Sequence, residues 1–142
     1  MSVSPVYTAF ATATGGRDGK ATIQGSDLVI DLDPPKEMGG KGEGNNPEQL
    51  FAAGYAACYI GAMKFATSQN DQLAKVPNDV SVAAEVGIGP RDEGGFGLVV
   101  TLKVALPGLS PEEAQAVADA GHKICPYSNA VRGNVVVTTE LV

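Results

Sequence analysis

Cysteine and histidine are scarce in this chain of 142 residues, which contains two cysteines and one histidine. Two cysteines are too few for the disulfide framework of a small secreted domain, and they do not form a CxxC unit. A zinc site would need His122, both cysteines and a carboxylate to converge, and none of the short ligand spacings that mark zinc sites is present. We therefore expect neither a metal site nor a disulfide scaffold.

Basic residues are also few, since 10 Lys and Arg stand against 16 Asp and Glu and give a formal net charge of -6. Nucleic acids and anionic membranes are bound through clustered Lys and Arg side chains. The basic residues here are scattered along the chain. The composition therefore argues against nucleic-acid and membrane partners.

Long apolar runs are absent as well. No stretch of roughly 18 apolar residues occurs, and the N-terminus lacks the positive region that opens a secretory signal. We expect a soluble, cytoplasmic protein. The apolar fraction of 44% and charged fraction of 18% are those of one globular domain, here residues 1–142. A domain of this size gains stability from a partner that covers an apolar face, which favours dimerisation.

Alternating apolar residues predict six strands. They cover residues 7–13, 21–23, 28–30, 80–88, 96–106 and 135–141. The glycine-rich sequence at 15–19 predicts a tight turn after the first strand, with Arg17 at its tip. Gly94 and Gly95 similarly join the fourth and fifth strands as a hairpin. We expect these strands to form antiparallel sheet.

A long helix is predicted from Asn46 onwards. Asn46 suits the N-cap, Pro47 the first helical position and Gln49 the capping-box position. Residues 50–64 are then apolar on nearly every face of the helix. This pattern predicts a central helix that is buried rather than amphipathic.

A second helix is predicted over residues 111–125. Ser110 begins a capping signature, and small or apolar residues recur at helical spacing as far as Cys125, where Pro126 should stop the helix. Cys125 should therefore face the core. The predicted fold class is α+β, with antiparallel sheets against a long buried central helix.

Cys58 lies in the middle of the first predicted helix, where burial should raise the pKa of its thiol and make it a poor nucleophile. It becomes reactive only beside a cation, and we expect Arg17 to be that cation. Arginine stays charged, and its forked donors can serve both a thiolate and an oxygen of the substrate. A reaction whose leaving group departs as a strong base, such as an alkoxide, would need the second of these interactions, because the developing charge must be stabilised.

Glu48 has two interpretations. A carboxylate in the first turn of a helix stabilises the helix by about 0.3 to 1 kcal/mol through the dipole. Alternatively, Glu48 orients Arg17. Glu48 and Cys58 are ten residues apart on one helix, hence about 15 Å apart along its axis. If both serve one site, either one of them comes from a second subunit or the helix breaks between them.

Three segments resemble the signature regions of the organic hydroperoxide resistance (Ohr) family, which lies within the larger Ohr/OsmC group. They are ATGGRDGKA at 13–21, NPEQLFAAGYAACYIGAMK at 46–64 and HKICPYSNAVRGN at 122–134. The resemblance runs through essentially the whole chain. It implies an OsmC-like fold, an intertwined homodimer with sites at the subunit interface, and a peroxidase that reduces alkyl and lipid hydroperoxides.

The resemblance also implies a role for four residues. Cys58 corresponds to the peroxidatic cysteine, which becomes a sulfenic acid, and Cys125 to the resolving cysteine, which condenses with it to a disulfide. Arg17 corresponds to the arginine that activates the thiolate, and Glu48 to the carboxylate that orients this arginine. The thiols then serve in place of a metal, haem or flavin. The implied reductant is an external dithiol such as a lipoylated protein.

The family assembly and the helix geometry together predict that Glu48 reaches Arg17 and Cys58 across the homodimer interface, with the two long helices in its core. Three other functions stay open. They are an OsmC-type peroxidase of broader specificity, a non-catalytic protein that binds a hydrophobic ligand, and a hydrolase that uses Cys58 with His122. For His122 itself we favour a structural role. The residues that fix the loop after the second cysteine should be Tyr127, Ser128, Asn129 and Arg132.

Overall fold

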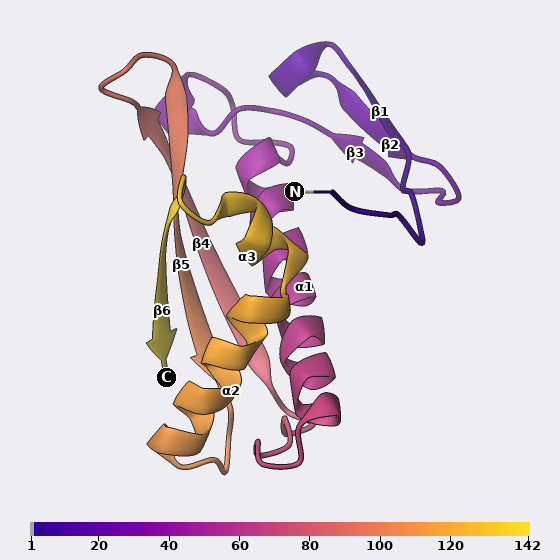
Figure 1. Ribbon diagram of the computed structural model, residues 1–142. Coiled ribbons are helices and arrows are strands. Elements are labelled where there is room, and N and C mark those ends of the chain that lie inside the picture. Colours follow the sequence, from indigo (N-terminus) through magenta and orange to yellow (C-terminus); the bar gives the residue numbers. More distant parts are fainter. Residues whose placement is uncertain (1) are drawn as a thin grey trace. The chain divides into compact units, whose positions relative to one another are not determined.

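The structure, a computed structural model, describes residues 2–142 and contains two compact units that divide the chain after Leu50 (Figure 1). The N-terminal unit, residues 2–50, contains a three-stranded sheet, and the C-terminal unit, residues 51–142, contains a second three-stranded sheet with helices. No helix among the described residues combines the length and apolar character needed to cross a membrane. Whether the two units form one domain depends on how they associate with each other. The single domain over residues 1–142 therefore stays a prediction.

The sheet of the N-terminal unit is an antiparallel meander, as predicted. Its strands in spatial order are β1 (Ala11–Thr14), β2 (Lys20–Ile23) and β3 (Val29–Asp31). The first strand is shorter than predicted, because β2 ends with Ile23 opposite Ala11. Within the N-terminal unit, the alternating residues before Phe10 therefore have no strand to pair with.

The turn between β1 and β2 holds Arg17 at its tip, as predicted. Thr14 pairs with Lys20, so only five residues connect the two strands, and Gly16–Asp18 form a 3₁₀ turn among them. Gly15 and Gly16 both adopt a φ of 75°. Side chains with a Cβ rarely occupy that region, so the glycines allow the turn that presents Arg17.

Helix α1 (Pro47–Gln69) begins where the capping signals predicted. The Asn46 side chain accepts a hydrogen bond from the backbone N–H of Gln49 at 2.9 Å, and the Gln49 side chain accepts one from the backbone N–H of Asn46 at 3.0 Å. This reciprocal pair is a capping box. It fixes the first turn of α1, which carries Glu48.

The prediction that α1 is a buried helix holds for only part of its surface in the single chain. One face is buried, and it consists of Tyr55, Tyr59, Ala62, Met63 and Ala66. Another face is exposed and carries the apolar residues Ala53, Ala57, Gly61 and Phe65 at intervals of four residues. The helix is apolar all round, but one chain covers only part of it.

The sheet of the C-terminal unit is mixed rather than antiparallel. Strands β4 (Ser81–Pro90) and β5 (Phe96–Ala105) form the predicted antiparallel hairpin, whereas β6 (Val136–Leu141) pairs parallel to β5. Two helices lie between β5 and β6 and cross one face of the sheet, so the chain returns to the sheet in the same direction (Figure 1). This crossover is why the antiparallel prediction fails for β6.

Helices α2 (Pro111–Ile124) and α3 (Pro126–Val131) form this crossover. Ser110 and Glu113 make the predicted capping box at the start of α2. Pro126 ends α2 as expected, but it also occupies the first turn of α3, where its missing N–H costs nothing. The predicted loop after Cys125 is therefore a short helix.

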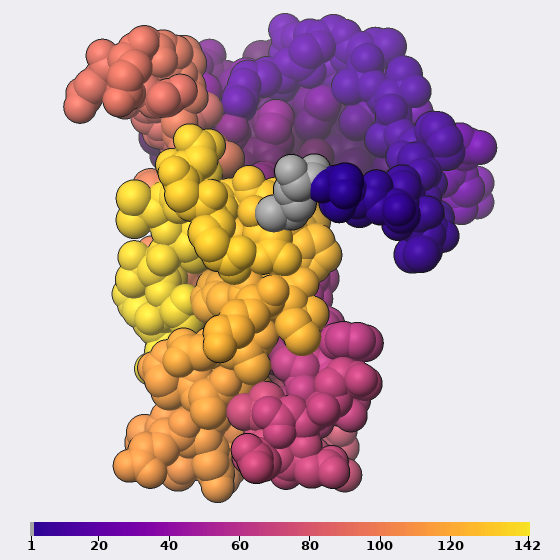
Figure 2. Space-filling view, viewed as in Figure 1, coloured from indigo at the N-terminus to yellow at the C-terminus, as the bar shows by residue number. Residues whose placement is uncertain are grey.

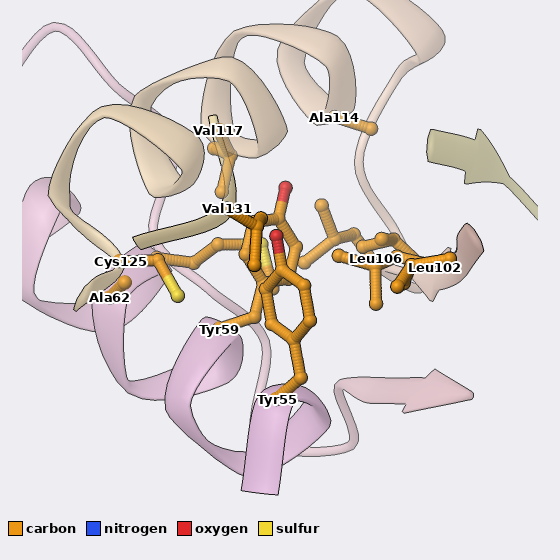
Figure 3. Packing of buried hydrophobic residues seen from close by; sticks show 12 residues of the cluster. Tyr55, Tyr59, Ala62, Leu102, Leu106, Ala114, Val117, Cys125 and Val131 are labelled. Carbon is orange, nitrogen blue, oxygen red and sulfur yellow. The ribbon is translucent and has the colours of Figure 1, made fainter. Parts of the chain in front are cut away.

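The C-terminal half of α1 and helix α2 lie directly against each other (Figure 2). Gly121 of α2 permits this approach, because a Cβ at this position would lie 2.6 Å from Cγ of Met63. Tyr55 and Tyr59 point from α1 toward α2 and α3, beside Val117 and Val131 (Figure 3). The core of the C-terminal unit thus lies between α1, β5 and the α2–α3 crossover.

Candidate active site

The two cysteines, which we call the thiol pair, lie in contact although 67 positions separate them in the sequence. The distance between Cys58 Sγ and Cys125 Sγ is 3.8 Å, and both are free thiols. Cys58 is half-buried and Cys125 is fully buried. A disulfide bond has a length of about 2.05 Å, so a shift of roughly 2 Å would join the two sulfurs.

Cys125 occupies the junction of α2 and α3. It is both the C-cap of α2 and the N-cap of α3. Its N–H donates to the carbonyl of Gly121 at 2.8 Å, and its carbonyl accepts from the N–H of Asn129 at 2.9 Å. The position of Cys125 thus depends on how both helices pack against α1, which carries Cys58.

Burial raises the pKa of the Cys58 thiol, as the sequence predicted. A backbone N–H of Tyr127 opposes the effect by favouring the thiolate, whereas the neighbouring Cys125 adds to it. The thiol form of Cys58 is therefore favoured near neutral pH, and it is a weak nucleophile. The packing that brings the sulfurs together does not by itself make Cys58 reactive.

Arg17 and Glu48, which we call the ion pair, form a bidentate salt bridge. Arg17 Nη1 donates to Glu48 Oε2 at 2.9 Å, and Nη2 donates to Oε1 at 2.7 Å. The guanidinium holds the pKa of the Glu48 carboxyl below its usual value, and the carboxylate raises the pKa of Arg17. The Arg17 side chain remains 39% exposed, against 11% for Glu48, so the cation keeps an accessible face.

The ion pair forms within one chain, so the prediction that Glu48 reaches Arg17 across a subunit interface is wrong. The β1–β2 turn and the first turn of α1 both belong to the N-terminal unit, and they supply the two partners. The thiol pair belongs to the C-terminal unit. The structure thus shows two pairs, the ion pair within the N-terminal unit and the thiol pair within the C-terminal unit.

His122 has the structural role that we favoured. Its Nδ1 lies 2.9 Å from Ser128 Oγ and its Nε2 lies 2.7 Å from Thr139 Oγ1. Both ring nitrogens are thus paired with hydroxyls rather than with Cys58, which argues against a hydrolase that uses Cys58 with His122. In the described part of the chain, no three His, Cys, Asp or Glu side chains converge as metal ligands would.

The contacts of α3 are partly those expected from the sequence. Arg132 Nη2 donates to the carbonyl of His122 at 2.6 Å and Nη1 donates to the Asn129 side chain, so both residues do fix this segment. The sequence did not reveal that Ser128 contacts Tyr55, whose hydroxyl lies 2.8 Å from Ser128 Oγ. The only available signal was a tyrosine on a core helix, because a buried phenol needs a hydrogen-bond partner.

Comparison with known proteins defines the family. A family profile described as OsmC-like protein matches residues 40–140. The chain belongs to the OsmC-like protein family. It is 55% identical over 137 residues to the organic hydroperoxide resistance protein of Xanthomonas axonopodis pv. citri, and the match covers 96% of this chain and 94% of the relative. This relative confirms the resemblance to the Ohr group.

Solved structures of OsmC-like proteins have the same fold. A putative organic hydroperoxide resistance protein from Vibrio cholerae, with captopril bound in one of its active sites, matches with a TM-score of 0.89 and 42% identity, covering 99% of this chain and 95% of that one. OhrB of Bacillus subtilis matches with a TM-score of 0.85 and 40% identity, covering 97% and 100%. The fold of this chain is therefore the OsmC-like fold that these Ohr proteins share.

Replacing Arg17 by Ala should raise the pKa of the Glu48 carboxyl, because the guanidinium that stabilises the carboxylate is removed while the burial that opposes ionisation remains. An NMR titration of the Glu48 side chain in both proteins measures the change. Lys20→Ala removes another cation of the N-terminal unit, one paired with Asp31 instead, and is the control. An unchanged Glu48 titration in Arg17→Ala would show that the salt bridge does not form in solution.

Proposed function

We propose that this OsmC-like protein is a thiol-dependent peroxidase that reduces organic hydroperoxides to alcohols. The contact at 3.8 Å between two free thiols, one half-buried and one fully buried, carries the proposal. It provides a nucleophile together with a partner that can resolve its oxidised form. The names of the relatives, which refer to resistance against organic hydroperoxides, support the same substrate class.

Cys58 is the attacking thiol in this proposal, because it is the less buried of the two. Its thiolate attacks one oxygen of the hydroperoxide, so that an S–O bond forms and the O–O bond breaks. The electron pair of the broken bond leaves on the alkoxide, which takes a proton to become the alcohol. Cys58 is oxidised to a sulfenic acid, and the hydroperoxide is reduced by two electrons.

Cys125 then resolves the sulfenic acid. Its sulfur attacks the sulfur of Cys58, the S–S bond forms, and the S–O bond breaks. The departing hydroxide takes the proton of the Cys125 thiol and leaves as water. An external dithiol, for which we propose a lipoylated protein, returns both thiols by exchange that starts at the more accessible Cys58. The redox-active groups are the protein's own two sulfurs.

Activation of Cys58 is assigned in this proposal to the ion pair of a second subunit. Helix α1 is unbroken from Pro47 to Gln69, so Glu48 lies about 15 Å along the axis from Cys58 of the same chain. That separation is too large for one hydrogen-bonded site. In a homodimer, the partner subunit's Arg17 would stabilise the thiolate of Cys58 and then the leaving alkoxide, while the partner's Glu48 holds it in place.

The surface of the single chain supports a homodimer. Among the described residues of the N-terminal unit, only Leu32 and Asn46 are buried. The large apolar side chains exposed in this unit are Val3, Val6, Tyr7, Phe10, Ile23, Leu28, Val29, Met38 and Leu50. The exposed apolar face of α1 adds to this surface. A monomer rarely leaves so much apolar surface uncovered, and a two-fold symmetric partner would cover both copies of it.

Cys58→Ser should abolish peroxide turnover, whereas Cys125→Ser should consume one equivalent of hydroperoxide and stop at the sulfenic acid, since no second thiol resolves it. Thiol titration and intact mass after one equivalent of cumene hydroperoxide distinguish the two variants. The wild type should lose two thiols per chain. Sustained turnover by Cys125→Ser with a dithiol would contradict the resolving role.

A higher kcat/KM for cumene hydroperoxide than for hydrogen peroxide would separate this protein from an OsmC-type peroxidase of broader specificity.

Arg17→Ala should raise the pKa of Cys58 and slow its reaction with hydroperoxide, because the buried thiolate loses the cation that offsets its desolvation. The pH dependence of the alkylation of Cys58 by iodoacetamide, measured in the Cys125→Ser background, reports this pKa. Arg91→Ala removes an exposed arginine of the β4–β5 hairpin region and should leave the profile unchanged. The same alkylation profile with and without Arg17 would exclude the activating role.

The protein should sediment at twice the chain mass of 14.5 kDa, because the exposed apolar face of α1 and the poorly covered N-terminal unit need a partner. Ala57→Glu, in the middle of the exposed face of α1, should shift the equilibrium toward monomer and lower peroxidase activity together with it. Ala116→Glu places the same charge on an exposed position of α2 and is the control. A wild-type monomer at the assay concentration would rule out the shared site.

A further inference from the structure

The hydroxyl of Ser128 joins the two helices that carry the thiol pair. Tyr55 precedes Cys58 by one turn of α1, and Ser128 follows Cys125 by one turn of α3. The Tyr55 hydroxyl and Ser128 Oγ lie 2.8 Å apart in a buried contact. This hydrogen bond thus joins α1 to α3 one helical turn away from each sulfur.

Ser128 is held on its other side by His122 of α2, whose Nδ1 lies 2.9 Å from the same Oγ. Ser128 is 4% exposed and Tyr55 is fully buried. A hydroxyl carries one proton and two acceptor lone pairs, so Ser128 can donate in at most one of these bonds and accepts in at least one. The position of Oγ is therefore set from α1 and α2 together.

The network around Ser128 adjoins a cavity of about 280 Å³. Its polar lining side chains are Tyr55, His122, Ser128, Arg132 and Thr139, and each of them is already hydrogen-bonded within the protein. A binding site would present polar groups that a ligand can use. The arrangement is instead that of a network that holds its own members in place.

We propose that Ser128 is a positioning residue for disulfide formation: through Tyr55 it holds the first turn of α3, and with it Cys125, within reach of Cys58. The chemical step is the attack of the Cys125 sulfur on the Cys58 sulfenic acid, and in this respect the inference rests on the proposed peroxidase function. The mutual position of the two sulfurs does not rest on that function. Ser128 contacts no reacting atom and acts only through the placement of Cys125.

Ser128→Ala tests the proposal in a single turnover. After one equivalent of cumene hydroperoxide, the disulfide should form roughly 10- to 100-fold more slowly than in the wild type, because a displacement of about 1 Å has that effect on the reaction of two held groups. Dimedone should therefore trap more of the Cys58 sulfenic acid. The rate of the first step is measured as loss of hydroperoxide in the Cys125→Ser background. Adding Ser128→Ala to this background should change that rate by less than about twofold.

A redox equilibrium provides a readout that needs no peroxide. In dithiothreitol buffers, the Cys58–Cys125 disulfide of Ser128→Ala should be easier to reduce, because the two thiols are less well held together. A tenfold loss in the equilibrium constant corresponds to a rise of about 30 mV in the reduction potential. An unchanged potential together with an unchanged rate of disulfide formation would overturn the proposal.

Tyr55→Phe removes the same hydrogen bond from the other side and leaves the contact between Ser128 and His122 intact. It should slow disulfide formation as Ser128→Ala does, and the double variant should be no slower than the slower single variant. Tyr59→Phe is the matched control, because it removes a buried tyrosine hydroxyl that binds the carbonyl of Ala118 instead. It should change the rate by less than about twofold.

The outcomes separate the two proposals. If the wild type does not react with hydroperoxide, the proposed function is wrong, and the reduction potentials still test the positioning role. If Tyr55→Phe forms the disulfide as fast as the wild type, or if Tyr59→Phe is slowed equally, the Tyr55–Ser128 bond is not what positions Cys125. Should Ser128→Ala fail to fold, Tyr55→Phe carries the same test.

Discussion

The packing of α1 against the junction of α2 and α3 is the constraint on which the candidate chemistry depends. It brings Cys58 Sγ and Cys125 Sγ to 3.8 Å across 67 positions of sequence. The same packing fully buries Cys125 and half-buries Cys58, and this burial disfavours the thiolate and raises the pKa of Cys58. The arrangement that makes a disulfide easy to form thus makes its first nucleophile weak. The proposed peroxidase therefore needs a source of positive charge beside the Cys58 thiol.

The ion pair suits the role that we propose for it, because its geometry is already fixed within the N-terminal unit. The capping box at Asn46 and Gln49 sets the first turn of α1 and so the position of Glu48. Two parallel hydrogen bonds then fix the plane of the Arg17 guanidinium. A lone arginine on a glycine turn would have to be ordered at the moment of reaction. The N-terminal unit has little core of its own, so we expect its position to be set by association rather than by internal packing.

Much of this structure was predictable because local signals specify it. The capping residues located the start of α1, and the alternation on either side of Gly94 and Gly95 located the β4–β5 hairpin. The direction of β6 was not predictable in the same way, because side chains alternate identically in parallel and antiparallel strands. The exposed face of α1 could not be read from composition either. An apolar stretch indicates that a helix needs covering, but not which chain covers it.

The site was predictable as a set of residues but not as a set of contacts. Cys58 and Arg17 stand out in the sequence because each is a chemically distinctive residue in an unusual local setting. Ser128 does not stand out, since its partner Tyr55 is 73 positions away and both residues have ordinary structural explanations.

Apolar side chains of similar size could fill the space between Tyr55 and Ser128, but apolar packing tolerates small shifts of one helix along another. Hydrogen bonds do not tolerate such shifts, because their strength falls steeply once distance and angle depart from a narrow range. Two sulfurs that must meet within a bond length therefore benefit from a polar contact beside them, even though burying the hydroxyls has a cost.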